Sequence, residues 1–155
     1  MPVAVPGLVG VAVSAIGTGS AHSCAVTTAG AVSCWGQNTA GSWEHPGTDA
    51  PRNSVTPVAV VGASSGVVAV AGGVNYTCAR YTSGAVKCWG QGGSLGIGTI
   101  DGKDSATQVV GLTSGVTAIA AGPGHACAIQ SGALKCWGST KFGRSEEHTS
   151  ELQSP

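Results

Sequence analysis

Six cysteines are the residues of this sequence whose type and spacing point to the most definite chemistry. They form three pairs, with nine, nine and eight residues between the members, namely Cys24 with Cys34, Cys78 with Cys88, and Cys127 with Cys136. A glycine-containing turn lies midway in each pair, so antiparallel pairing about it would place the two cysteines opposite each other at a separation that a disulfide accepts. One geometry repeated three times favours these local disulfides among the many connectivities that six cysteines allow. Disulfides persist in oxidising compartments, so the pairs also predict an extracellular or cell-surface protein.

Two other uses of the cysteines remain open at this point. Reduced, buried thiols would act as small hydrophobic side chains. A structural zinc site would need cysteines about two to four residues apart, a spacing that the chain does not contain. We therefore predict no metal ion and no cofactor.

Two histidines stand two residues before a cysteine and invite comparison with Cys–His nucleophile pairs. His22 precedes Cys24 and His125 precedes Cys127, whereas Tyr76 takes the same place in the copy between them. No acid that would orient the histidine recurs nearby, and a catalytic site is not normally repeated along a chain. The sequence favours a packing role, or a hydrogen bond between repeats, and we predict no catalytic residue and no enzyme activity.

The elements that position these residues are expected to be short strands. The chain is 42% hydrophobic and 9% charged, which is typical of a globular protein. Good helix formers are scarce, whereas Val, Ala, Ser and Thr dominate and 26 glycines interrupt the apolar runs. This composition predicts an all-β fold with many tight turns.

A repeat of roughly fifty residues organises the chain. Each copy has a His-x-Cys-Ala or Tyr-x-Cys-Ala segment, a glycine turn and a Cys-Trp-Gly segment, which ends at Gly36, Gly90 and Gly138. Period-2 alternation predicts strands over 11–16, 22–27, 31–35 and 56–61 in the first copy. Four strands per repeat predict a propeller blade.

The predicted boundaries follow from that repeat. A fourth-strand pattern recurs at 107–112 and at 2–8, so the chain would open within a blade. We assign 1–10 to the end of a preceding blade, 11–62 and 63–115 to the first and second repeats, and 116–143 to a partial third. Blades missing from both ends would leave open edges, which predicts aggregation of the isolated chain.

The Gly-x-x-His-x-Cys-Ala and Gly-x-Val-x-Cys-Trp-Gly segments resemble the repeat of the regulator of chromosome condensation family, in its Cys-containing bacterial extracellular form. The resemblance implies an incomplete β-propeller of about three four-stranded antiparallel blades, in a family that closes its propeller with seven. The family's Asn-x-x-Gly-Gln-Leu-Gly-x-Gly-Thr segment survives only in part, at 93–99, and the first repeat departs from it further.

Four tryptophans divide into two kinds. Trp35, Trp89 and Trp137 recur in register, so they are expected to be blade-packing anchors whose indole N–H groups meet backbone partners. Trp43 is unrepeated and lies in a polar loop, which makes it the candidate contact residue for a partner.

The last residues break from the repeat. Residues 144–154 are charged and contain neither Val nor further Gly, and they read as the translation of a sequencing-library adapter, as happens in genes assembled from environmental, metagenomic DNA. A natural helical or disordered tail is the alternative. We set 144–155 aside as a non-native or disordered tail.

Charge and hydropathy exclude some classes of partner. Seven basic and seven acidic residues balance, and the basic ones form no stripe that could follow a phosphate backbone, so nucleic-acid binding is not expected. No apolar run is long enough to span a bilayer, and a fragment need not carry its signal peptide. The sequence favours a protein-binding or scaffolding propeller module of a secreted bacterial protein, with an unknown protein partner and the remaining blades of the parent protein. Alternatives are a guanine-nucleotide exchange factor-like propeller and a non-catalytic propeller part of a larger extracellular enzyme.

Overall fold

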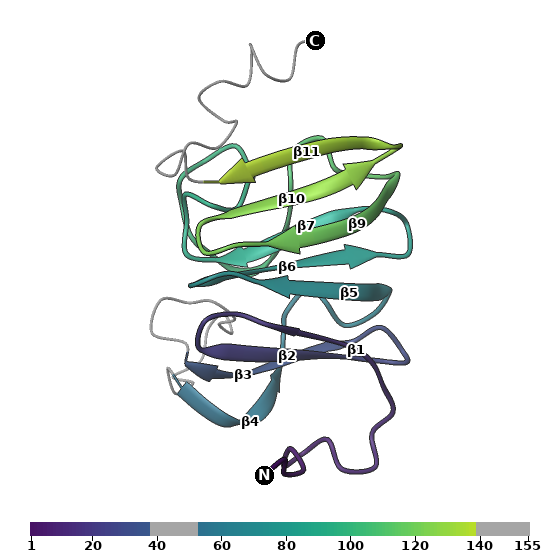
Figure 1. The fold of residues 1–155 in the computed structure, drawn as a ribbon, viewed down its shortest axis with the longest axis vertical. Coiled ribbons are helices and arrows are strands. Elements are labelled where there is room, and N and C mark those ends of the chain that lie inside the picture. The colour runs from purple at the N-terminus through teal and green to yellow at the C-terminus, as the bar shows by residue number, and fades with distance from the viewer. Residues whose placement is uncertain (38–52, 139–155) are drawn as a thin grey trace.

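The computed structural model describes residues 1–37 and 53–138, and this part of the chain is all-β, as predicted (Figure 1). Three antiparallel sheets follow one another along the chain, and each pairs its strands in sequence order. Sheet 1 holds β1 (Val13–Thr18), β2 (His22–Thr27), β3 (Val32–Gln37) and β4 (Asn53–Ala59). Sheet 2 holds β5 (Val67–Gly72), β6 (Tyr76–Tyr81), β7 (Val86–Gly90) and β8 (Lys103–Gln108). Sheet 3 holds β9 (Val116–Ala121), β10 (His125–Gln130) and β11 (Ala133–Gly138).

The sheets stack as consecutive blades. Figure 1 shows them one above the other, from sheet 1 near the N-terminus to sheet 3 at the opposite end. The first strands of the blades lie next to one another, since β1 contacts β5 and β5 contacts β9. No helix of the described residues could cross a membrane.

The predicted fourth strands were placed too late in the repeat. The segments at Val60 and Val109 end in turns, because Ala63 N–H donates to Val60 C=O at 3.2 Å and Leu112 N–H donates to Val109 C=O at 3.1 Å. Gly62 supplies the positive φ, +85°, that the third position of such a turn needs. The observed strands β4 and β8 come before these turns, so the apolar pattern marks the connector to the next blade.

The same connector turn occurs near the N-terminus, where a strand over 2–8 was predicted. Leu8 N–H donates to Val5 C=O at 3.1 Å, and Gly7 has a φ of +86°. Pro6 occupies the second position of this turn, where its fixed φ is favourable. No strand forms over residues 1–12.

The core consists of two apolar clusters, one between each pair of neighbouring sheets. The first junction, between sheets 1 and 2, buries Cys24, Val26, Val32, Cys34, Val60, Ala63, Val67, Val70, Ala79 and Trp89. The second junction, between sheets 2 and 3, buries Tyr76, Cys78, Val86, Cys88, Leu95, Val109, Leu112, Val116, Ala126, Ala128 and Trp137. Sheet-to-sheet packing therefore supplies the core, as expected when each repeat cannot bury its own apolar faces.

Candidate functional site

The six cysteines form the three local disulfides that the repeat predicted. Cys24–Cys34, Cys78–Cys88 and Cys127–Cys136 have Cα separations of 4.1, 4.1 and 4.0 Å. Each pair lies directly opposite across a hairpin, because β2 pairs with β3, β6 with β7, and β10 with β11 in that register. With their sulfurs in disulfides, these cysteines are neither nucleophiles nor metal ligands, and the described residues contain no group of three metal-ligating side chains.

His22 links two blades, as the sequence suggested. Its Nε2 lies 2.9 Å from the Thr77 hydroxyl of sheet 2, and both side chains are buried. Burial lowers the pKa of the imidazole below its ordinary value, because the charged ring loses its hydration. The neutral ring packs against Gly19, where a Cβ would lie 2.1 Å from the imidazole Cε1.

Tyr76 links the blades of the second junction by a hydrogen bond, as His22 links those of the first. Its hydroxyl donates 2.8 Å to the Gly122 carbonyl of sheet 3, and it also reaches the carbonyl of His125. Its ring packs on Gly73, the counterpart of Gly19. The His-to-Tyr change therefore keeps the link between blades and replaces only the group that makes it.

The repeated tryptophans anchor the blades, but not through their indole N–H groups. Trp89 is fully buried in the first junction and Trp137 is buried in the second, where its ring lies on Gly96. The predicted backbone partners are wrong for both, because neither indole nitrogen has a hydrogen-bond partner in the part of the chain that the structure describes. Apolar contact area is what holds these rings, and it outweighs one unsatisfied donor in each.

A polar groove opens at one end of sheets 2 and 3. It has a volume of about 570 Å³ and is lined by Val74, Asn75, Tyr76, Gln91, Gly92, Gly93, Ser94, Pro123, Gly124 and Gly138. The antiparallel topology brings these residues together, since the loops after β5, β7 and β9 all leave at the same end of the blades. The groove therefore belongs to the loop end of the stack, opposite the hairpin turns and connectors.

Hydrogen bonds hold the walls of the polar groove in place. Asn75 donates from Nδ2 to Gln91 Oε1 at 3.0 Å, and the Gln91 N–H donates to the Asn75 carbonyl at 2.7 Å. The Ser94 hydroxyl donates 3.0 Å to the Gly124 carbonyl, which joins the walls from sheets 2 and 3. Asn75 and Gln91 contribute neutral amides, and none of the described residues that line the groove is acidic, basic or a free thiol. The described lining of the groove can therefore donate and accept hydrogen bonds through amide, hydroxyl and backbone groups.

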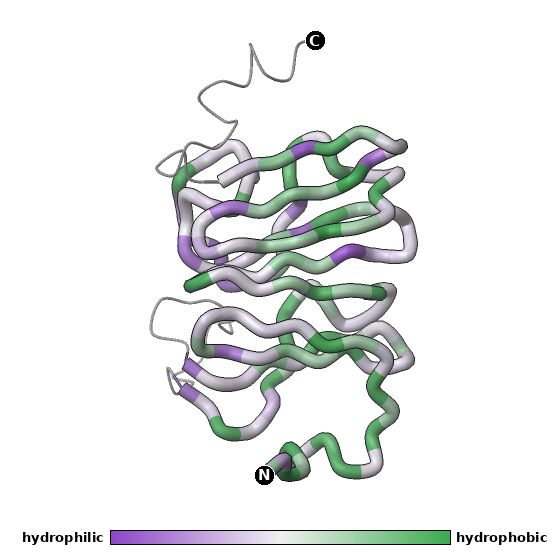
Figure 2. Tube along the Cα trace, viewed as in Figure 1, coloured by the Kyte–Doolittle hydropathy of each residue, from purple (hydrophilic) through white to green (hydrophobic). Residues whose placement is uncertain are grey.

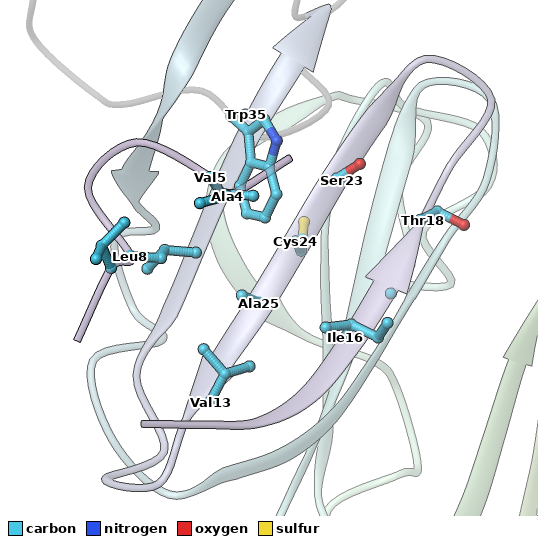
Figure 3. Close-up of a pocket in the computed structure, with 12 residues that line it drawn as sticks. Ala4, Val5, Leu8, Val13, Ile16, Thr18, Ser23, Cys24, Ala25 and Trp35 are labelled. Atoms are coloured by element: carbon cyan, nitrogen blue, oxygen red, sulfur yellow. The ribbon is translucent and has the colours of Figure 1, made fainter. Parts of the chain in front are cut away.

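An apolar hollow opens on the outer face of sheet 1. Figure 3 shows Trp35 above Ala4 and Val5, with Val13, Ile16 and Ala25 along the neighbouring strands. The hollow has a volume of about 450 Å³, and Leu8 and Val9 complete its apolar lining. Figure 2 shows that the N-terminal segment beside it is largely apolar. Trp35 is the counterpart of Trp89 and Trp137, but no sheet covers it.

Comparison with known proteins identifies the repeat. Residues 13–42 match the family model of the regulator of chromosome condensation (RCC1) repeat. The chain carries an RCC1 repeat. The stretch covers β1 to β3 of sheet 1, and the same hairpin, disulfide and Trp-Gly segment recur in sheets 2 and 3.

The blades have the fold of RCC1 propellers. A crystal structure of human WBSCR16 matches with a TM-score of 0.70 and 24% identity, over 84% of this chain and 35% of that one. Yeast RCC1 (Prp20) bound to Kap60 matches at 0.66 and 19% identity, over 79% of this chain and 31% of that one. Prp20p from Saccharomyces cerevisiae matches at 0.67 and 16% identity, over 98% and 36%. The chain thus spans about a third of the length of these structures, and no curated protein matches it in sequence.

Sequence reasoning found the disulfide positions of the RCC1 blades and offered a link between blades as one of two roles for His22. It did not predict the link through Tyr76, and it missed the polar groove. The disulfide positions and His22 repeat in the chain, and repetition made them visible. The groove residues Asn75, Gln91 and Ser94 do not form a motif, because three loops from two blades build it. Their only signal is the polar, glycine-rich character of the loops. Trp43, the predicted contact residue, lies outside the described residues.

Proposed function

We propose that this chain is a protein-binding or scaffolding propeller module of a secreted bacterial protein, and that the polar groove at its loop end is where a partner docks. The observation that carries the proposal is the groove itself, whose walls from two blades are joined by hydrogen bonds and whose described lining offers neutral hydrogen-bonding groups. Such a surface suits a protein segment that offers amide and hydroxyl groups. Recognition sites commonly lie on loops that a rigid scaffold positions.

The fold neighbours support a binding role. Yeast RCC1 was crystallised bound to Kap60, and the Prp20p structure was described with its binding properties to Gsp1p and histones. Those partners belong to those proteins. What supports the proposal for this chain is that proteins with this blade fold bind macromolecular partners.

The three disulfides support the secreted setting. Every described cysteine is paired, and two of the three pairs are fully buried. Disulfides of this kind form and persist outside reducing compartments. An exchange factor would work in a reducing compartment, so stable oxidised pairs favour the secreted module over that alternative.

The proposal is tested by panning a displayed peptide library on the oxidised chain and measuring the affinity of the recovered peptides. Gln91→Arg would put a long cation into the groove and break the amide pair with Asn75, so we expect it to abolish peptide binding. Thr113→Arg is the matched control, because Thr113 is exposed in the connector at the opposite end of the blades. We expect this variant to bind as the wild type does.

Two results would contradict the proposal. If the recovered peptides bind the Gln91→Arg variant as tightly as the wild type, the docking site lies outside the groove. Failure to enrich any binder on the folded, oxidised chain would argue against a protein-binding module.

A further inference from the structure

Both blade junctions join two unlike faces. The disulfide face of sheet 1 consists of Cys24, Val26, Val32 and Cys34, and it packs on the Trp face of sheet 2, which consists of Val67, Val70, Ala79 and Trp89. In the second junction Cys78, Val86 and Cys88 of sheet 2 meet the sheet 3 residues Val116, Ala126, Ala128 and Trp137. In both junctions, therefore, a disulfide face packs against a Trp face.

Among residues 1–37 and 53–138, one face of each kind has no sheet packed on it. Sheet 1 presents a Trp face of Val13, Ile16 and Trp35 around Ala25, which is itself buried. Sheet 3 presents a disulfide face of Cys127, Ile129 and Leu134, with Cys136 bonded to Cys127. Ile16 is 74% exposed although its counterpart Val70 is 8% exposed. Leu134 is 69% exposed although its counterpart Val86 is buried completely. These are the faces that the two junctions cover.

Backbone groups match as well as side chains. In the first junction Val32 N–H donates to the Ala63 carbonyl at 2.8 Å, and Val60 N–H donates to the Val32 carbonyl at 3.0 Å. The second junction repeats both bonds, with Val86, Leu112 and Val109 in those places. On the open faces, Leu134 of sheet 3 stands at the position of Val32. In the N-terminal connector, Val5 and Leu8 stand at the positions of Val60 and Ala63.

The polar link between blades also has its counterpart. Ser23 occupies the position of Thr77 and lines the hollow of the open Trp face. His125 occupies the position of His22, whose Nε2 meets the Thr77 hydroxyl. A sheet 3 placed on a sheet 1 would therefore bring a histidine to a hydroxyl, as the first junction does.

We propose that copies of this chain associate head to tail, with the disulfide face of sheet 3 in one copy packed on the Trp face of sheet 1 in the next. The occupant of each open face is a second copy, because the chain itself carries the complementary face in the register of its own junctions. The contact is heterologous, so it uses different surfaces on the two copies and extends until a ring closes. This inference concerns the sheet faces and is independent of the polar groove.

The test is the mass of the oxidised chain by light scattering over a wide range of concentration. We expect the wild type to form species larger than a monomer, and Ile16→Glu or Leu134→Glu to remain monomeric. Both side chains are exposed in one copy, so the substitutions should leave the fold and its circular dichroism unchanged. Ile100→Glu is the matched control, because Ile100 is an exposed isoleucine, at 86%, in the loop between β7 and β8. It should associate like the wild type.

Mixing the two variants decides the arrangement. Ile16→Glu keeps an intact disulfide face and Leu134→Glu keeps an intact Trp face, so an equal mixture should form one-to-one dimers that do not grow. Dimers of either variant alone would show that like faces pair and would overturn the proposal. A wild type that stays monomeric at every concentration would overturn it too, and would leave the open faces to further blades of a longer chain.

Discussion

The closed junctions and the open faces of sheets 1 and 3 have apolar residues at equivalent positions of the repeat, yet these residues differ in burial. Val32 and Val86 are 1% and 0% exposed, whereas Leu134, which stands at the same place in sheet 3, is 69% exposed. Full burial of such a side chain contributes about 1.5–3 kcal/mol. The neighbouring blade, and not the position within the repeat, therefore stabilises the side chain.

The outer faces of sheets 1 and 3 are apolar. Repeat proteins usually finish in capping units with polar outer faces, which keep the array soluble. Here the outer faces of sheets 1 and 3 carry the same apolar residues as the junctions, including Trp35 and Leu134. The outer faces of the described sheets therefore lack the polar surface that is typical of capping units.

The largest expected difference between junction and end face comes from one substitution made in both. Trp89→Ala removes a fully buried ring from the first junction and should lower the free energy of unfolding by about 3–5 kcal/mol. Trp35→Ala removes the same ring from the open hollow and should cost markedly less, because part of the ring is already in contact with water. Urea denaturation at a concentration where the chain is monomeric measures both.

Equal losses for these two variants would show that the open face is covered in the isolated chain. Raising the protein concentration sharpens the comparison. If copies associate through this face, the cost of Trp35→Ala should increase with concentration and that of Trp89→Ala should not.

A smaller difference is expected at the hairpin turns. Gly84 and Gly132 have φ values of +81° and +84°, so alanine at either position would adopt a left-handed backbone conformation that costs about 1–2 kcal/mol. A Cβ on Gly84 would also lie 2.4 Å from the Gly115 nitrogen of the next blade, whereas one on Gly132 meets nothing within 4 Å. Gly84→Ala should therefore be the more destabilising by about 1–3 kcal/mol, the usual range for overpacking. Thermal denaturation of both variants gives the difference directly, and a difference of zero would mean that the backbone of the junction shifts freely.

The smallest expected effect is the pH response of the first junction. Burial holds the pKa of His22 below its ordinary value of 6.5. As the pH falls, the unfolded chain therefore binds a proton at this histidine before the folded chain does. The contribution of this neutral histidine to stability is present above pH 6.5 and is lost as the pH falls below it. His22→Tyr, which places the residue of the second junction in the first, should weaken this acid sensitivity. Denaturation midpoints at about pH 7.5 and about pH 5.5 test it, and identical pH slopes for both proteins would exclude His22 as the source.

Much of the blade could be predicted from the sequence because its constraints are local. A hairpin turn sets which residues face each other, so the spacing of Cys24 and Cys34 about Gly30 determined their pairing before any neighbour was considered. The strand β2 was predicted with its observed bounds for the same reason. The fourth strands were misplaced because the apolar run at Val60 is buried by the next blade, and alternation alone does not separate a strand from a buried connector.

The sequence by itself determined the all-β repeat and the three disulfides, since each depends on spacing within one hairpin or on repetition along the chain. Only the tertiary structure decided how the residues of the blades are used. It placed Trp89 against the preceding sheet with its N–H unsatisfied, brought Asn75, Gln91 and Ser94 together in a groove, and left Ile16 and Leu134 uncovered. The physical reason is that burial is a property of two surfaces in contact, and the second surface lies in a different blade.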